Sequence, residues 1–455
     1  MIRALGFAVS IATTLLFGSV PRAVGQTSSD GTPATGEKVE KKSQPDWQAI
    51  YDLSRSNNRL YLANITRIRS EQAEFLSDPY LSDMLMQMLG TEFSYIGRYQ
   101  QALECFDGKY APTKKAGQLT SAERYEPLDA VAAIVELADK HQVIMINEAH
   151  HVPMHRAFTL QLLDGLYQKG FRYFAAETLI HGDKSLQTLG YPTLGTGGYT
   201  AEPVYADLVR TALKRGYHVT AYECPESPTP DRKNPVPDIN VREQGQARNL
   251  KERILDRDPN AKIIVHAGFG HICKTSHSGK QGELKWMAVA FQELTGIEPF
   301  SIDQTVMSEL NKTENEKPDY RFAVEKGLVK ERPVVLRDKE KDVYFVCTGY
   351  EPMYDLSVIH PRSRYENGRP TWLEMGGRRT PHAVKTEFRP AEGKTYLAQA
   401  FLVEEMSPEA VPVDQMVYDS GEPLPTLWLP RSGKFQIRIV DEDAKIVDEY
   451  GLSDR

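Results

Sequence analysis

The sequence predicts an α/β protein built on a mostly parallel sheet with helices on both faces. Five short and nearly continuous apolar segments recur between residues 143 and 302, which is typical of strands buried on both faces. Stretches with the three-to-four spacing of apolar helix faces separate these segments, and such alternation predicts right-handed crossovers. The expected strands are 143–146, 173–176, 218–222, 262–266 and 300–302, and the expected helices are 128–140, 153–168, 202–215, 240–255 and 285–294.

The remaining chain divides into flanking regions around an α/β domain at 121–380. Residues 46–120 have a helical pattern, and 96–106 resemble the turn and second helix of a tetratricopeptide unit. Since one copy is visible, this small helical unit is either a packing element or a site for a protein partner. A further strand at 343–347 could extend the sheet, and 381–455 predicts a small β-rich appendage because short strand-like runs alternate with Pro and Gly.

The first 25 residues have the pattern of a secretory signal peptide. Arg3 precedes the apolar run 7–17, and Ala23-Val24-Gly25 forms a small-residue cleavage pattern before Gln26. An N-terminal membrane anchor is the rival interpretation, but the run is shorter than the roughly 20 residues of a spanning helix. We therefore expect export to the periplasm or secretion, a chain that does not span a membrane, and a disordered leader at 26–45.

Charge and cysteine content narrow the function classes. A formal net charge of -7 and a pI near 6.0 argue against a nucleic-acid partner, which requires a basic surface. Of the four cysteines, Cys224 and Cys273 each follow the end of a predicted strand. Because export permits disulfides, we expect these two to pair beside the sheet edge.

Acidic and histidine residues follow one predicted strand after another. Ligands of parallel α/β sheets bind at the carboxyl ends of the strands, and carboxylates buried there need partners or water. Any single carboxylate could instead cap the next helix, and Arg242 could form an ordinary intrahelical ion pair. As a set, these residues predict one polar site for a small-molecule ligand or substrate. The candidate catalytic residues are Glu148, His150, Glu177, Glu223, Arg242, Glu243 and His271.

Two further features border this site. His150, His151 and His155 could hold a divalent metal ion, with His151 and His155 one helical turn apart. The order departs from HExxH, so a solvated histidine pair on a helix surface is the alternative. The Gly-rich loop 190–199 lacks the GK[ST] ending of a phosphate loop, and we interpret it as a lid.

These residues carry a resemblance to a known superfamily. Glu148-x-His150 with His155, then Glu177, then Arg242-Glu243 with Ala247, and finally 268–271 together resemble the haem-binding uptake and Tiki superfamily. The nearest pattern is ChaN-like, with a distant similarity to erythromycin esterases, over about residues 125 to 350. Asn147 stands where the family usually has Gly, and His151 where it often has Asp. The resemblance implies the α/β fold, and its members include haem binders, esterases and metal-dependent proteases.

Two functions fit the pattern. In a hydrolase of ester, lactone or amide bonds, Glu148 or Glu177 would activate water and His150 or His271 would stabilise charge or protonate the leaving group. Without a GxSxG elbow, a serine nucleophile is not expected. In a binding and uptake protein, haem or another metal complex would be held by His or Tyr side chains, although a CxxCH attachment motif is missing. A third possibility is a protein whose inherited site is idle. Tyrosines available near the site are Tyr191, Tyr199, Tyr205 and Tyr222.

Overall fold

The computed structural model of the chain describes residues 61–110, 112, 116–225, 231 and 233–453. The expected signal peptide and leader lie outside these residues. Within them, the predicted fold class is confirmed: a six-stranded, wholly parallel sheet lies at the centre, in the order β10-β8-β2-β5-β3-β4. The strands are β2 (Val143–Glu148), β3 (Phe171–Ala176), β4 (His218–Ala221), β5 (Lys262–Gly268), β8 (Phe300–Asp303) and β10 (Leu356–Ser357).

Alternate residues of the strands face different layers of helices. Ile144 and Ile146 pack in one core with α5, α6 and α8, whereas Val143 and Met145 pack in a second core with α9 and α10. Both faces are therefore covered, which explains the continuous apolar runs of the strands. The helices are α5 (Ala130–Leu137), α6 (Pro153–Gln168), α8 (Pro203–Arg215), α9 (Val236–Leu250, extended by a π-helical turn at Lys251–Leu255) and α10 (Met287–Thr295).

The predicted strand at 343–347 is wrong. Tyr344 instead forms an isolated antiparallel β-bridge with Arg337. Arg337 belongs to β9 (Val334–Asp338), which pairs with β1 (Tyr125–Asp129) in a separate antiparallel ribbon. The edge of the sheet beside β8 is taken by β10. Smaller elements are α7 (Lys184–Leu189), α11 (Pro318–Glu325), the hairpin of β6 (His277–Gly279) and β7 (Gly282–Leu284), and the hairpin of β11 (Tyr365–Glu366) and β12 (Arg369–Pro370).

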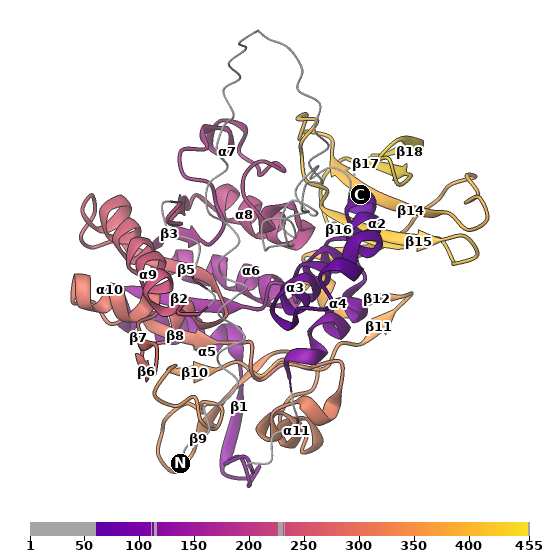
Figure 1. Cartoon of the computed structure of the whole chain (residues 1–455). Helices are drawn as coiled ribbons and strands as arrows, with labels where there is room; N and C mark the ends of the chain where they lie inside the picture. Colours follow the sequence, from indigo (N-terminus) through magenta and orange to yellow (C-terminus); the bar gives the residue numbers. More distant parts are fainter. Residues whose placement is uncertain (1–60, 111, 113–115, 226–230, 232, 454–455) are drawn as a thin grey trace, which may run out of the picture.

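The helical unit consists of α2 (Tyr61–Glu71), α3 (Pro79–Tyr95) and α4 (Tyr99–Phe106). Asp78 caps α3 by accepting hydrogen bonds from two amides of its first turn, and Gly97 provides the left-handed backbone of the turn into α4. Its core includes Leu194 and Ala201 from the α/β domain and Val417 from the C-terminal region. In Figure 1 these indigo helices lie between the central domain and the yellow C-terminal strands.

The C-terminal region is β-rich, as the sequence predicts. Its four-stranded antiparallel sheet has the order β15-β14-β17-β18, and a two-stranded ribbon pairs β13 with β16. The strands are β13 (Arg379–Ala383), β14 (Thr395–Leu402), β15 (Asp414–Asp419), β16 (Thr426–Pro430), β17 (Phe435–Val440) and β18 (Ile446–Leu452). In the described part of the chain, none of the helices combines the length and apolar character of a membrane span.

The expected disulfide between Cys224 and Cys273 is wrong, since neither residue is part of a disulfide bond in the structure. Cys224 follows β4 and Cys273 follows the turn after β5, and β3 lies between those two strands. Strands two positions apart are separated by roughly 10 Å, whereas a disulfide needs Cα atoms about 4.4 to 6.8 Å apart. Cys273 Sγ instead contacts Thr275.

Candidate active site

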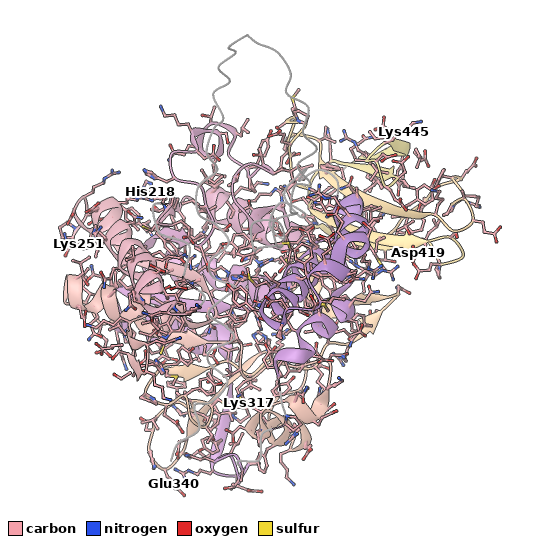
Figure 2. All side chains as sticks on the ribbon, viewed as in Figure 1. His218, Lys251, Lys317, Glu340, Asp419 and Lys445 are labelled. Carbon is pink, nitrogen blue, oxygen red and sulfur yellow. The ribbon has the colours of Figure 1, made fainter. Side chains whose placement is uncertain are left out.

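The seven candidate catalytic residues gather at the carboxyl ends of the parallel strands, and each is at least nine-tenths buried. Five lie at or shortly after a strand end, whereas Arg242 and Glu243 lie on α9. Together with their hydrogen-bond partners, the seven residues form two clusters, one beside α6 and α8 and the other beside α9. By contrast, charged residues such as Glu340 and Lys445 project from the outside of the molecule (Figure 2). The first cluster comprises Glu148, His150, Arg156, Glu202 and His266, and the second cluster comprises Glu177, Glu223, Arg242, Glu243, Gln246 and His271.

Glu148, the last residue of β2, is the centre of the first cluster. Its Oε1 atom accepts hydrogen bonds from His150 Nδ1 at 2.8 Å and Arg156 Nη2 at 2.8 Å. Its Oε2 atom accepts from Arg156 Nε at 2.5 Å and His266 Nε2 at 3.1 Å. Burial opposes ionisation, but the Arg156 guanidinium and these hydrogen bonds hold the pKa of Glu148 well below its usual range. With both oxygens occupied, Glu148 is an anionic anchor rather than a base open to water.

Arg156, in the first turns of α6, links this anchor to its surroundings. Its Nη1 atom donates to Glu202 Oε2 at 3.1 Å, and its Nη2 atom also donates to the carbonyl of His150 at 3.0 Å. Glu202 simultaneously caps α8 by accepting from the amides of Val204 and Tyr205. The guanidinium therefore fixes both the carboxylate and the backbone of His150, a geometry that suits its planar fork.

His150 presents an available nitrogen. Its Nδ1 atom is bonded to Glu148, while its Nε2 atom has no hydrogen-bond partner among the described residues. A Cβ atom at Gly268 would lie 2.5 Å from this Nε2 and 2.9 Å from Glu177 Oε2. His150 Nε2 and the Glu177 carboxylate therefore lie near the same point, where the two clusters meet.

Glu177 follows β3 and is held from two sides. Oε2 accepts a hydrogen bond from the Gly268 amide, and Oε1 accepts from Arg242 Nη2 at 3.1 Å. Burial opposes the charge, but His271, followed by His150 and Arg242, holds the pKa of Glu177 well below its usual range. The same Arg242 Nη2 donates to Glu223 Oε1 at 2.8 Å. The alternative of an ordinary intrahelical pair for Arg242 is wrong, because it joins carboxylates from two strand ends.

His271 lies between two carboxylates. Nδ1 is 2.7 Å from Glu243 Oε2, and Nε2 is 3.6 Å from Glu177 Oε1. Burial would lower the pKa of this imidazole, but Glu243 and Glu177 prevail and raise it to about 9. Arg242 Nη1 lies 3.1 Å from Nε2, a hydrogen bond when His271 is neutral, whereas protonated His271 turns its Nε2–H to Glu177. This arrangement can hold or release a proton.

Two residues beside the site have a left-handed backbone although they are not glycine. Thr178 follows Glu177 with a φ of 74°, and Phe269 follows Gly268 with a φ of 41°. Such conformations cost roughly 1 to 3 kcal/mol each and are found preferentially at functional sites. Thr178 Oγ1 accepts hydrogen bonds from the amides of Gly198 at 2.6 Å and Tyr199 at 3.2 Å. The strained residue therefore ties the Gly-rich loop to the site.

The structure does not bring the three candidate metal ligands to a common point. His151 stacks on the Phe106 ring, and His155 Nδ1 accepts from the Ala149 amide while its Nε2 contacts Ser308 Oγ. Within the described residues, no group of three or more His, Cys, Asp or Glu side chains is arranged to hold a metal ion. His150 Nε2 is the one nitrogen of the three rings placed to meet a ligand beside Glu177.

Sequence reasoning found the strand-end residues but missed their partners. Arg156 and Glu202 lie in helical segments where charged residues are usually solvated, yet both are buried here. Gln246, which donates to Glu223 Oε2 at 3.1 Å, is also one helical turn from Arg242 in α9. That spacing places Gln246 on the same helix face as Arg242, which was an available signal. Arg156 lacked any comparable signal.

Comparison with known proteins finds structural matches with low scores and no match in sequence. No protein-family model matches the chain, and no curated protein matches its sequence. Among solved structures, the type III effector HopBA1 aligns with a TM-score of 0.29 and 15% identity, over 40% of this chain and 87% of that one. A structure described as bacterial protein toxins aligns with a TM-score of 0.30 and 15% identity, over 60% of this chain and 64% of that one. The RRSP effector domain of a MARTX toxin from Vibrio vulnificus aligns with a TM-score of 0.27 and 14% identity, over 52% of this chain and 54% of that one.

Proposed function

We propose that this chain is an exported, ChaN-like hydrolase that cleaves an ester, lactone or amide bond of a small-molecule substrate with water activated by His150. The observation that carries this proposal is the state of the imidazole. Nδ1 is hydrogen-bonded to the buried Glu148 carboxylate, and Nε2 has no partner among the described residues and lies beside Glu177. An imidazole oriented by a carboxylate with its other nitrogen available is the arrangement of a general base.

In the proposed reaction, His150 Nε2 takes one proton from a water molecule while Nδ1–H remains bonded to Glu148. The resulting hydroxide attacks the carbonyl carbon of the substrate and forms the new C–O bond. As the tetrahedral intermediate collapses, the bond to the alcohol or amine breaks. The leaving group takes a proton from His150 or from His271. Because water attacks the substrate directly, no covalent enzyme intermediate forms.

Arg242 and protonated His271 supply the positive charge that such a step requires. Both are fixed by carboxylates in advance, Arg242 by Glu177 and Glu223 and His271 by Glu243. A negative charge that develops on the carbonyl oxygen near them would be stabilised without reorganisation of the site. This division of labour differs from the expectation that Glu148 or Glu177 activates water.

His150 Nε2 also favours a second function, the binding of haem or another metal complex by an imidazole nitrogen. Tyr199 stacks on the His150 ring at a centroid distance of 4.0 Å, and Phe269 lies edge-on at 5.2 Å. Both rings would have to move to admit a porphyrin. A haem titration of wild type and His150→Ala tests this function, and a stoichiometric Soret shift that depends on His150 would place it ahead of hydrolysis.

The hydrolase proposal is tested by a screen of p-nitrophenyl esters, lactones and peptide amides with purified protein. We expect at least one class to be hydrolysed, with a loss of about 10² to 10⁴ in kcat for His150→Gln. His218→Gln, at an exposed histidine of β4, is the matched control and should behave as wild type. Hydrolysis by His150→Gln at the wild-type rate would reject the assignment of the base.

A further inference from the structure

The candidate site is closed in this structure, and the covering segments come from outside the parallel sheet. Directly above His150 and His151 lie two aromatic rings. Tyr199 stacks on His150 with an interplanar angle of 20°, and Phe106 of α4 stacks on His151 at 3.4 Å with an angle of 8°. Because His150 is completely buried, a substrate can reach Nε2 only after covering side chains move, and Tyr199 covers one face of the ring.

Tyr199 belongs to the covering loop, which we define as residues 190–201. The helical unit holds both ends of the segment that carries Tyr199. The Tyr95 hydroxyl of α3 donates to the carbonyl of Gly198 at 3.1 Å, and the Tyr61 hydroxyl of α2 donates to the carbonyl of Ala201 at 2.9 Å. Both bonds are buried, where hydrogen bonds are hard to replace by water.

Apolar packing reinforces these two bonds. Leu194 and Ala201 of the covering loop belong to the same buried core as Leu81 and Leu85 of α3. On its outer side the loop pairs with the C-terminal region through the Leu194 amide, which donates to the carbonyl of Glu409 at 2.9 Å. The helical unit therefore contacts the loop along its length, while Thr178 holds the loop from the side of the site.

We propose that the helical unit formed by α2, α3 and α4 is an intramolecular gate that keeps Tyr199 on His150 most of the time and so limits the access of substrate to the site. Displacement of α2 and α3 frees the carbonyls of Gly198 and Ala201, lets the covering loop swing away and exposes His150 Nε2. The gate limits catalysis only if the proposed hydrolase function is correct, but the closure itself can be measured without any substrate. The helical unit then acts on its own chain and not as part of a tetratricopeptide array.

The test measures the accessibility of His150 with diethylpyrocarbonate, which reacts with an unprotonated imidazole nitrogen. Mass spectrometry of the peptide that contains His150 gives the rate of its modification in the full-length protein. The Tyr61→Phe/Tyr95→Phe variant keeps both rings and removes both hydroxyl groups. Since each buried hydrogen bond contributes about 1 kcal/mol, we expect modification of His150 to be about tenfold faster or more in the variant.

Tyr217→Phe is the matched control, because the Tyr217 hydroxyl donates to the carbonyl of Leu163 at 2.6 Å, away from the covering loop. It should leave the rate within about twofold of wild type. Alkylation of the buried Cys273 thiol, followed in the same samples, separates loop opening from global unfolding. The gate is rejected if the double variant matches Tyr217→Phe, or if Cys273 becomes reactive together with His150. Faster modification of His150 with no hydrolysis of any tested bond would support the gate and count against the hydrolase.

Discussion

Glu148 and His150 form a buried carboxylate–imidazole pair in which Nδ1 lies 2.8 Å from Oε1. In Glu148→Gln, the side-chain amide removes the charge and can donate a hydrogen bond where the carboxylate only accepts. His150 would then lose the tautomer that leaves Nε2 unprotonated. We expect kcat to fall by about a thousandfold, as measured on whichever substrate the wild type hydrolyses.

The same substitution also tests the structural role of Glu148. Arg156 keeps Glu202 but loses its closest partner, so we expect the free energy of unfolding to fall by about 3 kcal/mol in urea denaturation. Glu126→Gln is the control, because the Glu126–Arg337 pair is partly exposed and should contribute less than about 1 kcal/mol. A Glu148→Gln protein with wild-type kcat would contradict the assigned role of Glu148.

Gly268 gives a steric test of the point where the two clusters meet. A Cβ atom there would lie 2.3 Å from His150 Cε1 and 2.9 Å from Glu177 Oε2. We expect Gly268→Ala to displace one or both side chains, lower kcat at least tenfold and cost roughly 1 to 3 kcal/mol of stability. Gly279→Ala is the matched control, because a Cβ atom at Gly279 meets nothing within 4 Å. Equal activity of the two variants would show that the reaction does not occur at this point.

The sequence predicted the strands and helices of the central sheet well, because each one is marked by a local pattern of apolar residues. The helix expected at 153–168 has those bounds in the structure, since Pro153 begins it and its apolar residues recur regularly. The strands differ by one or two residues at their ends. The order of the strands could not be predicted, because crossovers of similar length lead to adjacent or distant positions. The wrong disulfide between Cys224 and Cys273 follows from this one unknown.

The candidate site was predictable to a similar extent. Glu148, Glu177 and Glu223 could be found because each follows an apolar strand, and parallel strands bring their carboxyl ends to one edge. Arg156 could not, because its pairing with Glu148 depends on the angle at which α6 packs on the sheet. The closure by Tyr61 and Tyr95 was equally hidden, since it joins residues more than 100 positions apart in the chain.

Stability should depend on pH through histidines buried behind the site. Burial lowers the pKa of His360 to about 3 and also holds that of His155 well below its usual range, with His360 contributing to the second shift. Between pH 6.5 and 3 the unfolded chain therefore binds protons that the native chain does not. The free energy of unfolding should fall as the pH drops below about 6.5, by up to roughly 1.4 kcal/mol per pH unit for each histidine.

Above about pH 6.5 we expect the opposite trend, in which the free energy of unfolding falls as the pH rises. The pKa of His271 is raised to about 9, so native protein holds a proton that the unfolded chain releases, and stability should decline from about pH 6.5 to 9. Urea denaturation at a series of pH values checks both limbs. His360→Gln, which can still donate to Gln304 Oε1, should flatten only the acid limb, and His271→Gln only the alkaline one. Unchanged slopes in both variants would refute this account.

Arg210 of α8 and Glu405 link the central domain to the C-terminal region. Nε donates to Oε1 at 2.6 Å, Nη2 donates to Oε2 at 2.7 Å, and both side chains are buried. Removal of either partner leaves an uncompensated buried charge, so Arg210→Met and Glu405→Leu should each reduce the free energy of unfolding by about 3 to 5 kcal/mol. The double variant Arg210→Met/Glu405→Leu should lose much less, because it buries no unpaired charge.

Chemical denaturation of the four proteins measures this difference, with Arg364→Ala as the control. Arg364 and Glu331 form an exposed pair with exposed fractions of 63% and 70%, so its loss should change stability by less than about 1 kcal/mol. If the double variant is as unstable as the sum of the two single ones, the two side chains act independently and the buried pair does not couple the two regions. A positive interaction energy of several kcal/mol in the double-mutant cycle identifies the pair as the coupling element.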